Sequence, residues 1–388
     1  MAAHGEPAGP VDPRPRDAVI VNRPRRMRRA SLPAERIPLG VPGDYKPCVA
    51  RLASGELLLV AFHQHRLEAE AIREELFFYR SADGGRTWSA RLPSPMLGRE
   101  PYLTVLSDGV ILMTAHHLKQ DVRNPYGHGY ALLHRSADGG MTWRTVPIPN
   151  TEVPGAPSDD WVVTSRNVLE RPDGSLWLGV SASRGRDFLW RSLDRGATWD
   201  RTRQSQCAGV DPTLLWWPFW AETVLWQTRA GDALGLWRVD PRVVPRLPGS
   251  DVPDYTGDNV ERLVVYRARD DGRRWTREPE LGSWYGEMYP ALLRLRDGRL
   301  LCTFTVRALG RPLGVQAVLG DELPDGFRFD FAYDRLILDI RTPTNASSSG
   351  GGFGPTVQPD DATLVTAYSW RDAEDQTHLE AVRWPVPE

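Results

Sequence analysis

Residues 81–88 read SADGGRTW and residues 136–143 read SADGGMTW, so one eight-residue pattern occurs twice in the first part of the chain. The pattern returns as SLDRGATW at residues 192–199 and, in a weaker form, as ARDDGRRW at residues 268–275. In such a turn the Asp carboxylate accepts backbone N–H groups, Gly adopts a positive φ, and Trp packs beneath as an apolar plug. We therefore interpret these segments as structural turns that recur in phase along the chain.

A second repeat accompanies the first. It consists of a short apolar strand, a turn of the SDG, PDG or RDG type, and a more hydrophobic strand. Its six copies begin at Lys46, Glu100, Arg166, Glu222, Tyr289 and Gly354. The spacing of about 55 to 65 residues suits one four-stranded sheet per copy, and the Asp-Gly turns are typical of β-hairpins.

Both repeats resemble the Asp-box, or BNR, repeats of the sialidase (neuraminidase) superfamily. This resemblance covers nearly the whole chain and implies an all-β fold, a six-bladed β-propeller of four-stranded antiparallel blades. We expect one propeller domain over residues 18–388 and a disordered arm over residues 1–17, which are rich in Pro, Gly and charge. The last blade lacks an outer strand, and Ala18 to Asn22 (AVIVN) is expected to fill that place and close the ring.

Composition narrows the range of partners. The chain carries 48 Lys and Arg against 50 Asp and Glu, and the net charge of -2 gives no general attraction to nucleic acid. No apolar stretch approaches the roughly 20 residues that span a bilayer, and no secretory signal is recognised, so a cytoplasmic location without membrane association is expected. The three cysteines, without CxxC spacing, predict neither disulfides nor a zinc site, and no cofactor or metal is expected.

In a propeller the innermost strand of each blade lines a central channel, so the residues that open these strands converge at one funnel. Here that set is unusually charged and comprises Lys46, Arg99, Glu100, Arg166, Glu222, Glu287, Tyr289 and Phe353. Converging Arg and Glu indicate a site for a polar, anionic ligand. The alternative is a solvated channel in which these charges satisfy one another as ion pairs.

The resemblance also implies a set of catalytic residues. Sialidases hold the carboxylate of their substrate with three arginines and use a tyrosine nucleophile, a Glu that serves as its base, and an Asp that acts as acid and base. Glu222 at the start of an inner strand and Arg238 at the end of the next strand match the family's Glu and second arginine. Arg311 is the match for the third arginine, with Arg307 close by.

Two positions depart from the family pattern. Lys46 stands where the first arginine is expected, because the Arg36-Ile37-Pro38 motif lies well before the hairpin. Phe353 stands where the tyrosine nucleophile is expected, and phenylalanine has no nucleophilic group. Tyr285 or Tyr289 is a substitute from the fifth copy, or else Glu222 and Glu287 act directly as a carboxylate pair.

The sequence does not decide which residue acts as the catalytic acid. The loop after the first hairpin offers Glu68 and Glu70 in place of the family's Asp, and we take Glu70 as the candidate, with Asp159 and Asp160 as rivals. The resulting site prediction has Glu222, Tyr289, Glu287 and Glu70 as catalytic residues, and Arg238, Arg311, Arg99, Arg166 and Lys46 as substrate-binding residues.

The sequence thus predicts a sialidase-like glycoside hydrolase with a carbohydrate substrate, acting from the chain end on a terminal, acidic sugar at the funnel. One alternative is a glycan- or protein-binding propeller that has lost its nucleophile, as Phe353 suggests. A polysaccharide lyase is the other. The fold alone does not decide among them, because propellers carry many unrelated functions.

Overall fold

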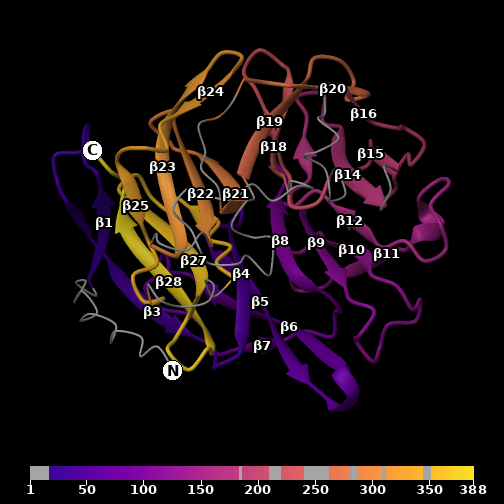
Figure 1. Ribbon diagram of the computed structural model, residues 1–388, viewed down its shortest axis with the longest axis horizontal. Helices are drawn as coiled ribbons and strands as arrows, with labels where there is room; N and C mark the ends of the chain where they lie inside the picture. The colour runs from indigo at the N-terminus through magenta and orange to yellow at the C-terminus, as the bar shows by residue number, and fades with distance from the viewer. Residues whose placement is uncertain are drawn as a thin grey trace, which may run out of the picture.

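The computed structural model describes residues 17–182, 186–208, 220–239, 262–279, 281, 286–307, 312–343 and 351–388. Within these ranges the regular structure is β-strand, apart from the 3-10 turns η1 (Glu68–Glu70) and η2 (Asn150–Glu152). The sheets surround a common centre, and the colour passes round the ring in chain order (Figure 1). Of the arm expected over residues 1–17, only Asp17 is described.

The strands pair into six sheets, of which five have four or five strands and the sixth has seven. The first contains β4 (Asp44–Arg51), β5 (Leu57–Arg66), β6 (Ile72–Ser81) and β7 (Leu92–Pro93). The second contains β8 (Arg99–Val105), β9 (Ile111–His117), β10 (Tyr130–Ser136) and β11 (Arg144–Ile148). The third contains β12 (Val162–Thr164), β13 (Leu169–Glu170), β14 (Leu176–Ala182) and β15 (Arg186–Ser192).

The later sheets are less uniform. The fourth contains β16 (Gln206–Ala208), β17 (Val224–Gln227), β18 (Ala233–Val239), β19 (Arg262–Ala268) and β20 (Arg274–Arg277). The seven-stranded sheet contains β1 (Ala18–Asn22), β2 (Ser31–Pro33), β21 (Glu287–Arg294), β22 (Arg299–Val306), β23 (Gly314–Leu323), β24 (Gly326–Phe329) and β25 (Arg335–Ile337). The remaining sheet contains β26 (Thr356–Val357), β27 (Thr363–Arg371), β28 (Thr377–Pro385) and β3 (Glu35–Leu39).

The all-β class and the propeller architecture of antiparallel blades are confirmed, whereas four strands in every blade is not what the structure shows. The fourth sheet gains β16, which pairs in parallel with β20. The seven-stranded sheet takes up β1 and β2 from the N-terminal part of the chain and β24 from a hairpin with β23.

The prediction that residues 18–22 complete the last blade is wrong. Strand β1 pairs with β25 in the seven-stranded sheet, and β3 instead supplies the outer strand beside β28. The reason is complementary charge: the side chain of Arg36 in β3 is only 3% exposed, and its Nη1 donates to Glu380 Oε2 at 2.8 Å, so β3 neutralises a carboxylate that β28 buries. Strand β1 has no charged side chain, and its Val19 and Val21 pack against Leu336 in the neighbouring core.

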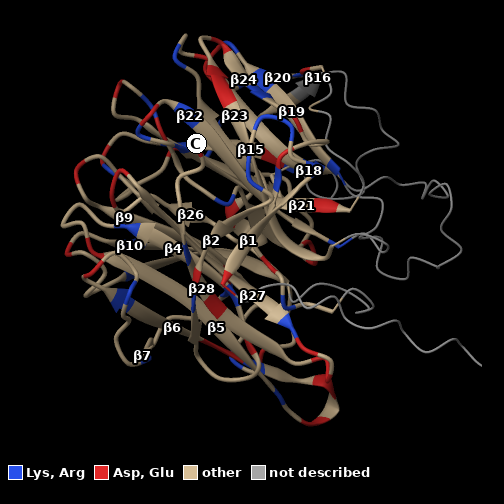
Figure 2. Cartoon of the chain, turned by 90° about the vertical axis from the view of Figure 1, so that its left-hand side faces the viewer, with Lys and Arg blue, Asp and Glu red and all other residues tan. Residues whose placement is uncertain are grey.

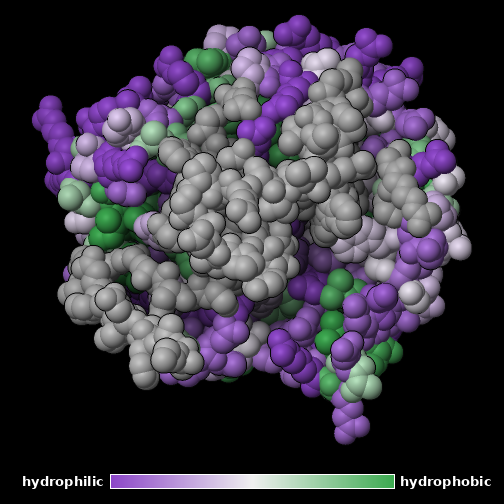
Figure 3. Space-filling model, in the orientation of Figure 1, coloured by the Kyte–Doolittle hydropathy of each residue, from purple (hydrophilic) through white to green (hydrophobic). Residues whose placement is uncertain are grey.

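The hydrophobic core lies between neighbouring sheets. Side chains of the first sheet such as Leu57 and Phe77 pack with Val365 of the last, which joins the two ends of the chain. Leu112 of the second sheet packs with Leu178 of the third in the same manner. Charged residues of both signs are interspersed along the edges of the sheets, and the rim of the visible face is largely hydrophilic (Figures 2 and 3). None of the helical turns in the described ranges is long and apolar enough to cross a membrane.

The eight-residue turns have the predicted geometry. Ser81 Oγ donates to Asp83 Oδ1 at 2.9 Å, and Asp83 Oδ1 accepts the Thr87 N–H at 2.9 Å. The Thr87 and Ser81 hydrogen bonds lower the pKa of Asp83 to about 2. The same bonds recur around Asp138 and Asp194, so these carboxylates are structural acceptors.

Candidate functional site

Five residues that open inner strands have a backbone conformation that is rare outside glycine. Positive φ angles occur at Lys46 (44°), Glu100 (51°), Glu222 (54°), Tyr289 (52°) and Phe353 (75°). Register shifts in β4, β8 and β21 coincide with the first, second and fourth of them. Such strain persists only where the surrounding structure enforces it, and it clusters at functional sites. The repeated bulge is therefore the device that turns these side chains toward one another.

The side chains meet in a cluster, called here the axial cluster, whose centre is Tyr289. Lys46 Nζ forms an ion pair with Glu100 and donates to the Tyr289 hydroxyl at 3.3 Å. The ring of Tyr289 lies against that of Phe353, with 4.6 Å between the centroids. Inner strands of the first, second and seven-stranded sheets and the segment before β26 therefore contribute to one site.

Three arginines of the axial cluster lie close to the rings of Tyr289 and Phe353. Arg238 Nη1 donates to Glu222 Oε2 at 2.6 Å, and its guanidinium carbon is 5.5 Å from the Tyr289 ring centroid. Arg307, directly after β22, lies 5.0 Å from the same centroid. Arg166, in the break between β12 and β13, lies 3.5 Å from the Phe353 ring and 5.7 Å from the Tyr289 ring.

Arg99 joins the axial cluster through carboxylates. Its Nη2 is 3.5 Å from Glu100 Oε1, and its Nη1 is 3.4 Å from Glu74 Oε1. Glu74 in β6 is fully buried, and sequence reasoning missed it. Its position four residues beyond Glu70, on a strand whose alternate residues face inward, was the available signal.

Two of the predicted catalytic carboxylates are placed elsewhere by the structure. Glu287 is buried, and its Oε1 accepts a hydrogen bond from Arg335 Nη1 at 2.7 Å within the seven-stranded sheet. The register shift after Met288 lies between Glu287 and Tyr289, so the two side chains point in different directions. The carboxylate of Glu287 is thus engaged by Arg335, and its pairing with Glu222 stays a prediction. Glu70 lies exposed in η1 at the end of the β5–β6 hairpin.

The structure describes some of the remaining candidates and leaves others outside. Arg311 and Tyr285 lie outside the described residues. Asp159 is exposed and Asp160 is buried. His63 contacts Asp44, with 2.8 Å between Nδ1 and Oδ1, and the part of the chain that the structure describes contains no group of three or more His, Cys, Asp or Glu side chains arranged to hold a metal.

Burial and the neighbouring charges shift the pKa values of two carboxylates near Tyr289 in opposite directions. Burial favours the neutral form of Glu100, but Lys46, His116 and Arg99 outweigh it and hold the Glu100 pKa well below its usual value. Burial raises the pKa of Glu222, although Arg238 opposes the shift. Glu100 is thus a fixed anion, whereas Glu222 is suited to exchange a proton.

The other titratable groups of the site are also shifted by burial. Burial raises the pKa of Tyr289 to about 12, with Arg307 and Lys46 acting in the opposite direction. Burial lowers the pKa of His116 to about 4, so that this imidazole is neutral at pH 7. The Tyr289 hydroxyl therefore needs a base before it acts as a nucleophile.

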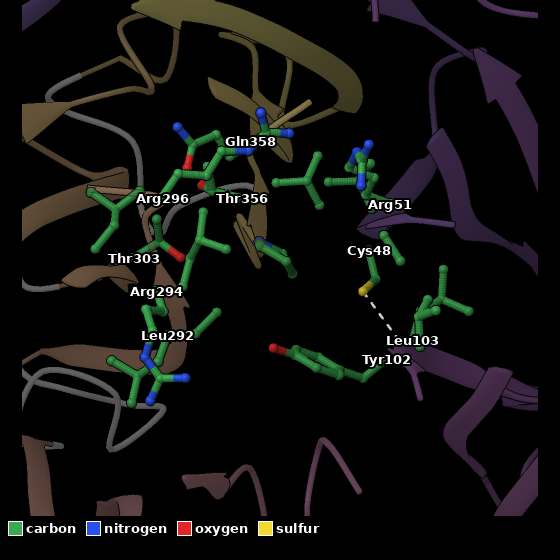
Figure 4. A pocket seen from close by; sticks show the side chains of 18 residues that line it. Cys48, Arg51, Tyr102, Leu103, Leu292, Arg294, Arg296, Thr303, Thr356 and Gln358 are labelled. Atoms are coloured by element: carbon green, nitrogen blue, oxygen red, sulfur yellow. Dashed lines mark hydrogen bonds between the residues drawn. The ribbon is translucent and has the colours of Figure 1, made fainter. Parts of the chain in front are cut away.

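The channel continues below the axial cluster as a cavity of about 430 Å³. Its walls are the residues that follow the axial bulges along β4, β8, β21 and β26. In Figure 4 the hydroxyl of Tyr102 points into this space, and Cys48 accepts the Leu103 N–H on one wall. The ring of Tyr102 lies 4.9 Å from the guanidinium carbon of Arg166, so this side chain separates the cavity from the axial cluster.

The ring of sheets defines the chain as a β-propeller built from repeats. A family model described as a BNR repeat-like domain matches residues 42–302, and the chain belongs to this family. A curated relative, a xyloglucanase of Paenibacillus sp., is 25% identical over 189 residues, which cover 47% of this chain and 16% of that protein. The chain thus spans only a small part of that relative.

Solved structures show the same fold. A protein of unknown function from Dyadobacter fermentans has a TM-score of 0.64 and 19% sequence identity, and the match covers 95% of this chain and 98% of that one. The intramolecular trans-sialidase of Ruminococcus gnavus has a TM-score of 0.59 and 14% identity, with 88% and 94% of the two chains covered. At these identities the likeness concerns the fold.

Proposed function

We propose that this protein is a glycoside hydrolase that removes a terminal acidic sugar, with its active site at the axial cluster of a six-bladed ring. In this proposal the seven-stranded sheet is the enlarged blade of that ring, and residues 18–388 form one domain. The observation that supports it best is the setting of Tyr289: a buried hydroxyl 3.3 Å from Lys46 Nζ, with Glu222 held nearby through Arg238. A buried tyrosine hydroxyl surrounded by cations acts as a nucleophile once a base has removed its proton.

The first chemical step uses Tyr289 and Glu222. Glu222 accepts the phenol proton, the Tyr289 oxygen forms a bond to the anomeric carbon, and the bond from that carbon to the leaving oxygen breaks. Lys46 stabilises the phenolate as it forms. The leaving oxygen takes a proton from an acid at the rim, for which Glu70 on the exposed β5–β6 hairpin stays the candidate.

The second step reverses the proton transfers. Water attacks the anomeric carbon, its proton passes to the rim carboxylate, and Tyr289 departs and regains its proton from Glu222. The sugar is released with retained configuration. A phenol nucleophile suits an acidic sugar, because a carboxylate in its place would repel the substrate's own charge.

The alternative is a propeller that binds glycans without cleaving them. The observation that favours it is Phe353, whose buried ring occupies the position expected for the family's nucleophile. An aromatic pair of Phe353 and Tyr289 beside several cations also suits binding alone.

A screen with chromogenic sialosides, uronides and neutral glycosides separates the two. Hydrolysis of an acidic glycoside by the wild type that disappears in Tyr289→Phe supports the hydrolase. Tyr130→Phe is the matched control, since this buried tyrosine contacts His117 in the second sheet and should retain activity. Binding of acidic sugars without turnover, or turnover that Tyr289→Phe leaves intact, contradicts the proposed mechanism.

A further inference from the structure

The cavity below the axial cluster opens at the far end of the channel. Along β4, β8 and β21 the residues after Lys46, Glu100 and Tyr289 line it in order, so each strand contributes side chains to successive levels of the cavity. The volume of about 430 Å³ is within the range of small-molecule sites, roughly 300 to 1,000 Å³. Its wall extends from Cys48 to Arg51 along β4, a length of about 10 Å. The levels along this length differ in chemistry.

Two hydroxyl groups face the inner level. The hydroxyls of Tyr102 and Thr303 are directed into the cavity from opposite walls (Figure 4). Neither has a hydrogen-bond partner among the residues that the structure describes, and Thr303 is only 2% exposed. By contrast, Thr305 on the same strand accepts the Phe353 N–H at 3.2 Å. A buried hydroxyl without a partner is costly, so the inner level is suited to a polar atom of a ligand.

The middle level is apolar. Its lining side chains are Val49, Leu103, Leu292, Leu293 and Val357. Leu292 and Leu293 lie on the innermost strand of their sheet and are nevertheless only partly buried. Apolar surface that faces a cavity is covered favourably by hydrocarbon, because burial removes it from water. This level is therefore suited to an unbranched chain of methylene groups.

Arginines surround the mouth of the cavity. Arg51, Arg294 and Arg296 line it, and the described lining residues include no Asp or Glu. Arg294 forms an ion pair with Glu322, and Arg296 Nη1 donates to Asp361 Oδ1 at 2.6 Å. Arg51 is exposed and has no ion pair with any residue in the described ranges. The mouth thus holds a cation whose charge is free to pair with a carboxylate from a ligand.

We propose that this cavity is a second binding site, for a short linear hydroxy acid. The carboxylate of the ligand pairs with Arg51 at the mouth, its chain covers the apolar middle level, and its hydroxyl group lies between those of Tyr102 and Thr303. A sugar ring does not suit the cavity, because its many hydroxyl groups would lie unpaired against the apolar walls. The site is independent of the proposed function, since Tyr102 separates it from the axial cluster and no step of the hydrolysis uses it.

A ligand-observed NMR titration with three probes tests the proposal. The probes are 6-hydroxyhexanoate, hexanoate, which lacks the hydroxyl group, and 1,6-hexanediol, which lacks the carboxylate. We expect 6-hydroxyhexanoate to bind about fivefold more tightly than hexanoate, because only the former bonds to the buried hydroxyls. It should bind about threefold more tightly than 1,6-hexanediol, because only the acid pairs with an arginine at the solvent-exposed mouth. The titration requires no turnover, so its outcome is separate from that of the glycosidase screen.

Two variants locate the binding. Arg51→Gln should remove the preference for 6-hydroxyhexanoate over 1,6-hexanediol, and Thr303→Val should remove the preference over hexanoate. Each variant should keep the other preference, and a thermal unfolding curve checks that Thr303→Val is folded. Arg144→Gln is the matched control for Arg51→Gln, since it alters an exposed arginine on the outer strand β11 and should bind as the wild type does. The proposal is overturned if no probe binds, if the wild type binds all three equally, or if either preference survives in the variant designed to remove it.

Discussion

Lys46 Nζ lies 3.3 Å from the hydroxyl of Tyr289, and both residues hold this contact from a left-handed backbone conformation, with φ of 44° and 52°. The two lie in β4 and β21, on separate sheets of the ring. In both strands a proline follows the residue with positive φ. Proline has no N–H group to donate to the neighbouring strand, and the register shift at this point means that no such hydrogen bond is needed. The strained backbone at both positions thus holds the Lys46 ammonium group beside the Tyr289 hydroxyl.

Replacing Tyr289 with Phe should abolish turnover while the fold persists. The variant removes the hydroxyl that contacts Lys46 but keeps the ring that packs on Phe353. If Tyr289 is the nucleophile, kcat should fall by roughly 1000-fold or more, since the covalent route is lost. Steady-state kinetics with the best acidic glycoside and a circular dichroism spectrum check this expectation. A kcat within tenfold of the wild type would remove Tyr289 from the chemical step.

Asp339 predicts a pH dependence of stability unrelated to catalysis. Burial raises the pKa of this carboxyl to about 6, although Thr342 and the Arg341 N–H donate to it. Between about pH 4 and pH 6 the folded state then holds a proton that the unfolded state has released, so the free energy of unfolding falls as pH rises. The loss is up to about 3 kcal/mol.

Asp339→Asn should remove this contribution, because asparagine does not titrate. The free energy of unfolding of the wild type and the variant is measured with guanidinium at pH 4.5 and pH 7. The contributions of all other titratable groups are the same in both proteins and cancel in the difference. A difference between the proteins that is the same at both pH values would show that the Asp339 carboxyl is ionised throughout.

The architecture was predictable because its determinants are local. The SxDxGxTW turns and the Asp-Gly hairpins each act within a few residues, so six copies were enough to indicate a propeller. The strand that completes the last sheet was not predictable in this way. Strands β1 and β3 are both five residues long, and only the pairing of Arg36 with Glu380, 344 residues away, selects β3.

The site was predictable where a residue opens an inner strand. Glu222, Tyr289 and Arg166 were expected to lie near one another, and the structure brings Tyr289 and Arg166 together beside Phe353. The pairing of Glu287 with Arg335 was not predicted, because a pattern of alternating residues does not reveal the register shift after Met288. For Glu74 the alternation along β6 was the only local signal, because no local motif encodes its contact with Arg99 of the next sheet.

The tryptophans of the repeated turns should differ in their contribution to stability. Sequence reasoning expected Trp88, Trp143 and Trp199 to be structural plugs, and each is only partly buried. Trp275, in the weakest copy of the turn, is fully buried and packs against Trp220 and Trp237. Trp275→Ala should therefore lower the free energy of unfolding by about 3 to 5 kcal/mol, and Trp143→Ala by clearly less. Chemical denaturation of the two variants ranks them, and equal losses would contradict the role of burial.

Glu222 should set the acidic limb of the activity profile. Its carboxylate accepts a 2.6 Å hydrogen bond from Arg238, yet burial raises its pKa above the usual value for Glu. As a base for Tyr289 it must be ionised, so kcat/KM should rise as pH increases through this raised pKa and level off above it. A catalytic carboxyl in ordinary solvent would give the same limb at lower pH.

Glu222→Gln should reduce kcat/KM by roughly 100-fold to 10,000-fold and abolish that limb, because glutamine keeps the size and the acceptor for Arg238 but takes no proton. Glu287→Gln is the matched control: it alters a buried carboxylate of the seven-stranded sheet that pairs with Arg335, and it should change stability while the limb remains. The measurement is a pH series of kcat/KM for the three proteins. An acidic limb that survives in Glu222→Gln would assign the base to another group and leave Glu222 as the residue that positions Arg238.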